Sequence, residues 1–267
     1  MRPWWIGPAG FPKAWGAEWL RLFRGLADRL SPWPRCLGAA LLLGVLPVLA
    51  DWATGVRTSH VVTGVLGTPL LLAAAARERA WPALWCLVLA VLAHCTAVAT
   101  LAAHDPERLA LAMPKGEEYW QETVAWLRTG EGGVYDTANW LPFHVMLALL
   151  MAAWGYVSLG LVPLVEGLTQ LDLMNFYVGR YLAHAEPGPA VVLAWHPWSV
   201  VRGIGFLFLV YELASFSLER LTGERLSPPS ARWRRLGTGV GLLALDCVVK
   251  WAWSEEARRL LAGQLAT

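Results

Sequence analysis

Charged residues are scarce in this sequence. Aspartate, glutamate, lysine and arginine make up 16% of its 267 residues, against roughly 25% in an average soluble domain. Hydrophobic residues make up 56%, and the mean hydropathy is +0.43. The net charge of +2 is small, and the basic residues form no stripe or groove suited to nucleic acid. The composition therefore excludes a nucleic-acid partner and indicates a protein of the lipid bilayer.

Sequence patterns of enzymes and metal sites are also missing. The four cysteines lie in or beside apolar runs and have no CxxC spacing, so buried structural thiols are expected and a zinc site or disulfide framework is not. The sequence has no HExxH, no GxSxG, no Walker-type glycine loop and no EF-hand loop. We therefore predict no catalytic residue and no metal ligand, and a non-enzyme is favoured over an enzyme.

Residues 1–35 lack the uninterrupted apolar stretch of a cleaved signal peptide, so the first membrane helix is expected to do the targeting. They are predicted to form an amphipathic segment on the membrane surface, because apolar side chains recur at helical spacing and charged ones take other faces. The apolar positions are Trp15, Trp19, Leu22, Leu26 and Leu30. The segment is interpreted as an anchor for the helix bundle, with docking of another subunit as the alternative.

Long apolar runs are what the sequence has in abundance. A helix needs about 18 or more apolar residues to cross a hydrocarbon core roughly 30 Å thick. Residues 36–103 hold three transmembrane candidates, over 36–55, 61–76 and 81–103. Arginines cluster before the first and after the second, and the positive-inside rule places both clusters and the N-terminus in the cytoplasm. An integral protein of a bacterial cytoplasmic (inner) membrane is expected.

The loop over residues 104–139 carries seven acidic and only three basic residues. A shortage of lysine and arginine agrees with an external face. Within the loop, GEEYWQETVAWLR predicts a short amphipathic helix with Tyr119, Trp120, Val124 and Leu127 on one side. This helix is expected to cap the outer end of the bundle.

Residues 140–254 hold the remaining transmembrane helices, and residues 255–267 form a C-terminal tail. Clear spans cover about 140–165, 198–218 and 236–253. Residues 168–185 are only moderately apolar. If they also cross, the five arginines between residues 217 and 235 return to the cytoplasm, so seven crossings are favoured over six. The alternative is a re-entrant or interfacial helix, broken around Asn175.

The fold class is therefore all-α. We predict a polytopic helical membrane protein with six or seven transmembrane helices and an N-terminal amphipathic interfacial helix. Tryptophans near the span ends, including Trp140 and Trp198, are expected to form an interfacial belt. Pro197 is expected to hold His196 in an extended conformation at a helix entry.

Asp246 lies near the middle of the last span, where an ionised carboxylate costs about 2.5 to 3.5 kcal/mol. Lys250 follows four residues later on the same helical face, where acidic and basic side chains can pair. Gly239 shares that face, and residues 237–241 form a GxxxG pattern typical of close helix packing. The face is expected to point into protein. The pair is interpreted as structural, with an ion or proton site as the alternative.

The preceding span carries Arg202 near one end and Glu212 deeper. Ten residues separate them, about 15 Å along a helix, so they cannot pair with each other. Arg202 can extend toward the membrane surface. Glu212 needs a partner such as Lys250, a wet cavity or a neutral state. Either residue is also a candidate for an intersubunit pair with the Asp246 and Lys250 face.

His94 in the third span and His144 in the fourth could lie at similar depth on antiparallel neighbours. Two such imidazoles could bind haem b. No further signature of a cofactor accompanies them, so histidines satisfied within the core and no cofactor are the preferred interpretation.

Three functions follow from these patterns. The first is a non-catalytic membrane subunit or scaffold, whose partners are the lipid bilayer and other membrane-protein subunits. The second is a transporter or channel that uses Asp246, Lys250 and Glu212, with the polar segment around Asn175 as a solute site. The third is a membrane haem protein or enzyme based on His94 and His144.

Overall fold

The computed structural model describes residues 13–76, 81–132, 137–185 and 189–265, and every regular element in these ranges is helical. The all-α prediction is confirmed. The helices in chain order are α1 (Lys13–Arg29), α2 (Trp33–Thr54), α3 (Ser59–Ala75), α4 (Trp81–His104), α5 (Pro106–Ala112), α6 (Pro114–Thr129), α7 (Thr137–Val157), α8 (Leu161–His184), the 3-10 helix η1 (Pro189–Trp195), α9 (Pro197–Thr222) and α10 (Pro229–Ala262).

Five helices in the described ranges are long and apolar enough to cross a membrane: Trp33–Thr54, Pro82–His104, Ala138–Val157, Pro197–Thr222 and Pro229–Ala262. The apolar helix α3 is shorter, at 17 residues. Large apolar side chains cover the outside of these helices, including Leu42 on α2, Leu149 on α7 and Val248 on α10. Apolar surface of this kind on spanning helices belongs in lipid. The chain is thus a helical protein of the membrane type.

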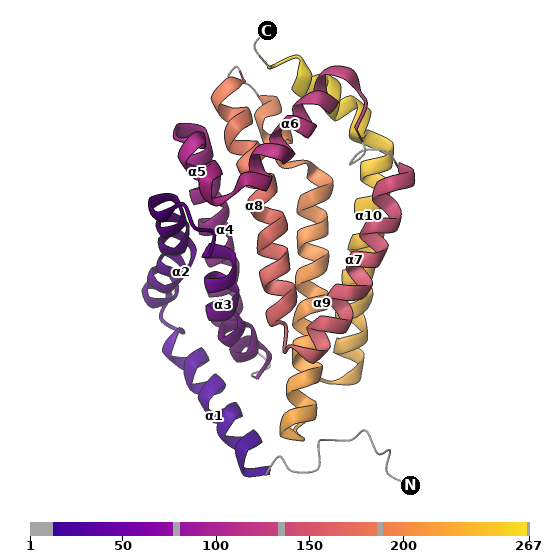
Figure 1. The fold of residues 1–267 in the computed structure, drawn as a ribbon. Coiled ribbons are helices and arrows are strands. Elements are labelled where there is room, and N and C mark those ends of the chain that lie inside the picture. The colour runs from indigo at the N-terminus through magenta and orange to yellow at the C-terminus, as the bar shows by residue number, and fades with distance from the viewer. Residues whose placement is uncertain (1–12, 77–80, 133–136, 186–188, 266–267) are drawn as a thin grey trace.

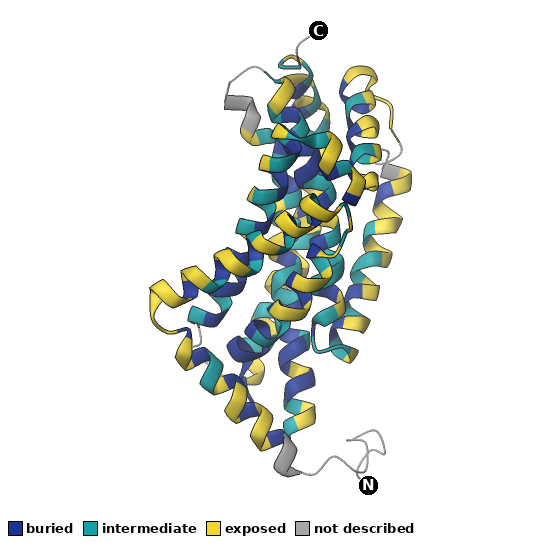
Figure 2. Cartoon of the chain, turned by 60° about the vertical axis from the view of Figure 1, so that its left-hand side comes forward, coloured by how far each residue is buried: buried dark blue, intermediate teal, exposed yellow. Residues whose placement is uncertain are grey.

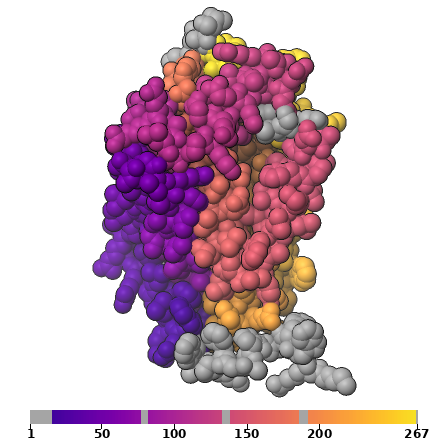
Figure 3. All heavy atoms as spheres, viewed as in Figure 1, coloured from indigo at the N-terminus to yellow at the C-terminus, as the bar shows by residue number. Residues whose placement is uncertain are grey.

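The helix α8 occupies the centre of the bundle (Figure 1). It packs against α3 and α4 on one side and against α7 on the other. The helix α2 lies against α4, and α9 packs along α10 and α7. The short helices α5 and α6 cover one end, where α6 contacts both α8 and α10 (Figures 1 and 3). A buried polar residue on α8 therefore lies among several helices.

The chain reverses direction between α7 and α8, inside the predicted span 140–165. Leu159 and Gly160 both have positive φ, 57° and 86°, a conformation that glycine adopts without strain. The polar residues 168–185 therefore belong to a continuous helix of 24 residues. Such a helix is about 36 Å long, enough to cross a hydrocarbon core. The predicted break around Asn175 is wrong.

The helix α1 has two apolar faces. Leu20, Phe23 and Ala27 are buried in the core that α1 shares with α3 and α9. Trp19 and Leu22, which were predicted on the same stripe, are exposed. Figure 2 shows buried and exposed residues alternating along this helix. The predicted stripe is therefore split between the bundle and the outside.

The helix α6 is amphipathic as predicted. Trp120, Trp126 and Leu127 are buried against Tyr177 and Tyr181 of α8 in a cluster that closes one end of the bundle. Four of its charged residues are exposed: Lys115, Glu118, Glu122 and Arg128. Glu117 is half-buried, accepts a hydrogen bond from Gln121 and lies 3.9 Å from Arg180 of α8.

Candidate functional site

The guanidinium of Arg202 on α9 meets the carboxylate of Asp246 on α10. The distances are 2.8 Å from Nε to Oδ2 and 3.0 Å from Nη2 to Oδ1. The side chain of Asp246 is 2% exposed, and that of Arg202 is 22% exposed. An arginine can bind both carboxylate oxygens at once, which makes this a strong geometry for an ion pair.

Both carboxylate oxygens of Asp246 are bound by Arg202 on the facing helix, where the sequence predicted a pair with Lys250. The Nζ of Lys250 lies 4.5 Å from the centre of the Trp140 ring on α7, within electrostatic range of Asp246 and Arg202. The face that carries Gly239, Asp246 and Lys250 is buried, as its spacing predicted. The partner of Asp246 therefore comes from α9, whereas the sequence predicted a partner on α10 itself.

Glu212 is bound by arginines, and not by Lys250 as the sequence analysis suggested. Arg235 donates a hydrogen bond to it, and Arg232 lies 3.5 Å away and also pairs with Glu219 at 2.7 Å. The reason is the antiparallel packing of α9 and α10. The register that places Arg202 beside Asp246 places the start of α10 beside Glu212, and it puts Lys250 near the other end of α9.

A second buried centre joins α4 to α8 and was not predicted. His94 Nε2 lies 2.6 Å from Asp172 Oδ1, and both side chains are fully buried. Arg57, before α3, donates from Nη2 to Asp172 Oδ2 at 3.1 Å. The Thr63 hydroxyl lies 3.4 Å from His94 Nδ1 and donates to the Leu43 carbonyl at 3.1 Å. Four segments thus meet around one imidazole and one carboxylate.

Two glycines allow the backbones around this centre to touch. A Cβ on Gly44 of α2 would lie 2.3 Å from the Ala90 carbonyl oxygen of α4, and one on Gly179 of α8 would lie 2.2 Å from the Ala99 carbonyl oxygen. Both contacts are closer than any real Cβ makes. The helices α2, α4 and α8 therefore approach one another at backbone distance, and His94 and Asp172 meet between them.

His94 and His144 do not form a pair. The helix α7 packs mainly on α9 and α8, whereas α4 packs on α2, α8 and α3. Both ring nitrogens of His94 have partners, and Nδ1 of His144 donates to the Trp140 carbonyl at 2.7 Å. The described part of the chain also holds no group of three or more His, Cys, Asp or Glu residues that could bind a metal ion. Haem binding by His94 and His144 stays a prediction.

His196 is buried at the start of α9 in a conformation that differs from the prediction. Its φ is 45°, not extended, and its exposed fraction is 2%. The ring stacks on Trp198 at 4.8 Å and on Tyr177 at 5.4 Å, and meets the edge of Trp126. Trp198 and Trp140 are also buried, so neither belongs to an interfacial belt.

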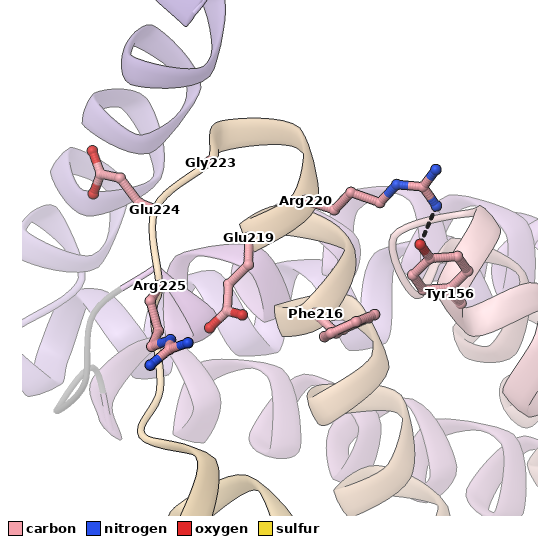
Figure 4. Close-up of a pocket in the computed structure, with 7 residues that line it drawn as sticks. All are labelled: Tyr156, Phe216, Glu219, Arg220, Gly223, Glu224 and Arg225. Atoms are coloured by element: carbon pink, nitrogen blue, oxygen red, sulfur yellow. Dashed lines mark hydrogen bonds between the residues drawn. The ribbon is translucent and has the colours of Figure 1, made fainter. Parts of the chain in front are cut away.

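A shallow pocket of about 250 Å³ opens at the opposite end of the molecule from α6. Figure 4 shows Phe216, Glu219 and Arg220 at the end of α9, with Tyr156 beside them. The Arg220 guanidinium donates to the Tyr156 hydroxyl. None of the predicted site residues lines this pocket, so it is separate from both buried centres.

No protein-family model, no curated protein and no solved structure matches this chain.

Proposed function

We propose that this chain is a multi-pass membrane protein that moves protons across the bilayer through the His94–Asp172 pair. The observation that carries the proposal is the position of the pair. Asp172 lies halfway along α8, and His94 lies just past the middle of α4, so both are near half the height of the bundle. Buried Asp and His residues at membrane depth commonly serve as proton relays.

The chemistry of the pair suits proton exchange. Imidazole is the side chain whose charge ordinarily changes near neutral pH, and it can bind a proton on either nitrogen. Nε2 of His94 contacts Asp172 and Nδ1 contacts the Thr63 hydroxyl, so a proton can leave on a different side from the one where it arrived. Arg57 balances the charge of Asp172 when His94 is neutral.

We also propose that seven helices cross the bilayer: α2, α3, α4, α7, α8, α9 and α10. This topology places α1 and the α9–α10 loop at one end, where Arg24 pairs with Glu224 at 2.9 Å, and α5 and α6 at the other (Figure 1). Arginines are concentrated at the α1 end, which the positive-inside rule assigns to the cytoplasm. Trp19 and Leu22 would then lie in the membrane interface beside α1.

Proton flux into liposomes tests the function. The purified protein is reconstituted with a trapped pH dye, and a potassium gradient with valinomycin drives protons inward. We expect wild-type flux above that of empty liposomes. His94→Gln and Asp172→Asn should each lower it by roughly a hundredfold, because positioned proton-transfer groups contribute that much or more.

The matched control is His144→Gln, which removes an imidazole on α7 that does not contact the pair. It should conduct like the wild type. The proposal fails if the wild type conducts no better than empty liposomes, or if the His94 and Asp172 variants conduct as well as the wild type.

A role as a non-catalytic subunit of a larger complex in a bacterial cytoplasmic membrane stays a prediction. Mass spectrometry of the gently solubilised native protein tests it, because the measured mass reports partner chains and bound cofactors together. A mass equal to this chain and lipid alone would contradict it.

A further inference from the structure

The segment from Arg57 to His60 connects α2 to α3 and lies directly beside the His94–Asp172 pair. Three side chains of this segment have buried polar atoms without a hydrogen-bond partner among the described residues: Arg57 Nε, Ser59 Oγ and His60 Nδ1. Ser59 is fully buried. Most buried polar atoms in proteins are hydrogen-bonded, so three exceptions within four residues require an explanation.

The acidic groups nearby are already engaged by other donors. Asp51 accepts hydrogen bonds from the backbone amides of Thr58 and Ser59 and from the Thr58 hydroxyl. Asp172 accepts from Arg57 Nη2 and lies 2.6 Å from His94. These carboxylates hold the segment in place, and the three buried polar atoms are left without a hydrogen-bond partner among the described residues.

We infer that the side chains of Arg57, Ser59 and His60 enclose ordered water, and that His60 passes protons through this water to the His94–Asp172 pair. Buried water typically makes two to four hydrogen bonds to polar groups of this kind. The inference rests on the proposed function and names the residue where protons enter.

The placement of His60 suits an entry group. It lies in the first turn of α3, at the end of the bundle that α5 and α6 cover, and it is half-buried. Thr63, which contacts His94, follows three residues later on the same helical face. His60 is therefore one helical turn from the pair and nearer to the outside.

The proton balance of the step is simple. The His60 ring takes up a proton from water on its exposed side and releases one to the enclosed water, and that water delivers a proton to the pair. The ring ends neutral, and one proton has moved inward. The charged and titratable groups around His60 are Arg57 before α3, Asp51 on α2, His94 on α4 and Asp172 on α8. The two carboxylates counter part of the repulsion between Arg57 and a protonated ring.

Flux measurements on the full chain in liposomes test the role of His60. We expect His60→Gln to lower proton flux by roughly a hundredfold, as for other positioned proton-transfer groups. The matched control is His184→Gln, because His184 is an exposed histidine at the same end of the bundle whose Nδ1 bonds the Arg180 carbonyl. Wild-type flux in His60→Gln overturns the role of His60.

Water contact is measured separately, by the transfer of magnetisation from water to the protein in solid-state NMR of the reconstituted chain. Transfer to Ser59 should be fast although its side chain is fully buried, whereas transfer to Leu71, equally buried on α3, should be slow. Equally slow transfer at both residues overturns the enclosed water.

The two measurements separate this inference from the proposed function. If His94→Gln and Asp172→Asn abolish flux but His60→Gln does not, the function stands and the entry role falls. If water reaches Ser59 but the wild type does not conduct, the water site stands and the function falls together with the entry role.

Discussion

Arg202 and Asp246 form a two-point ion pair between α9 and α10, with N···O distances of 2.8 and 3.0 Å. The carboxylate in the middle of the last helix is thus neutralised within the same chain. Removing one partner from a buried pair leaves a charge in a low-dielectric interior, which costs more than the pair itself contributes. This asymmetry gives a clear test.

Asp246→Ala should lower the free energy of unfolding by about 3 to 5 kcal/mol, because it leaves the Arg202 guanidinium beside apolar surface. The double variant Arg202→Met with Asp246→Leu should recover most of that loss. Unfolding in detergent, followed by circular dichroism, measures both. Glu255→Gln is the control, because Glu255 pairs with Arg258 and Arg259 on an exposed surface, where ion pairs contribute little, and the substitution should leave stability nearly unchanged. Equal stability of the single and double variants would contradict a structural pair.

Glu212→Gln should lower the free energy of unfolding by about 3 kcal/mol, because Arg235 then loses the carboxylate it binds and Arg232 keeps its ion pair with Glu219 alone. The same assay serves, with Glu166→Gln as control, because Glu166 is a carboxylate that accepts a hydrogen bond from Gln170, one turn further along α8. Additivity tests whether Lys250 contacts Glu212. If Lys250→Met destabilised the fold by removing such a contact, the changes in unfolding free energy of the two substitutions would not add. We expect them to add, since Lys250 lies over Trp140 instead.

The sequence predicted the apolar helices and the amphipathic cap because both depend on local periodicity. It did not locate the turn between α7 and α8, because residues on both sides of Gly160 are equally apolar. The available signals were Gly160 itself and Pro163 in the first turn of α8, a pairing typical of one helix ending and the next beginning.

The ion-pair partners were harder to predict for a different reason. Spacing along one helix can show that Asp246 and Lys250 share a face, but only the register between helices decides which side chain faces them. The same limit applies to His94 and Asp172, which are 78 residues apart in sequence. Each looked like an isolated polar residue in an apolar run. A search for opposite polar residues at equal depth on different predicted helices could have paired them.

Gly44 and Gly237 should respond oppositely to alanine. Gly44→Ala places a Cβ 2.3 Å from the Ala90 carbonyl oxygen and should destabilise the fold by about 1 to 3 kcal/mol through overpacking. Gly237→Ala meets nothing within 4 Å and should stabilise α10 by up to about 1 kcal/mol through helix propensity. The melting temperatures of the two variants, each compared with the wild type, test both expectations. If Gly237→Ala were the damaging one, the GxxxG face would pack against a second chain.

His196 should make the fold sensitive to acid. Burial, together with the positive charges of Lys250 and Arg202, lowers the pKa of His196 from its ordinary value of 6.5 to about 3. The unfolded chain then binds a proton below pH 6.5 that the folded chain does not, so stability is complete above pH 6.5 and falls as the pH drops toward 3. Between pH 6.5 and 4.5 the loss from this one group is about 2 kcal/mol.

The measurement compares melting temperatures at pH 7 and pH 4.5 for the wild type and His196→Asn, since asparagine tolerates the positive φ of 45° at this position. The informative quantity is the difference between the two proteins, because other groups of the chain also titrate between these pH values. We expect the drop in melting temperature to be smaller in His196→Asn, while His184→Gln, at an exposed histidine, keeps the full drop. Equal drops in all three proteins would show that His196 becomes protonated without opening the aromatic cluster around it.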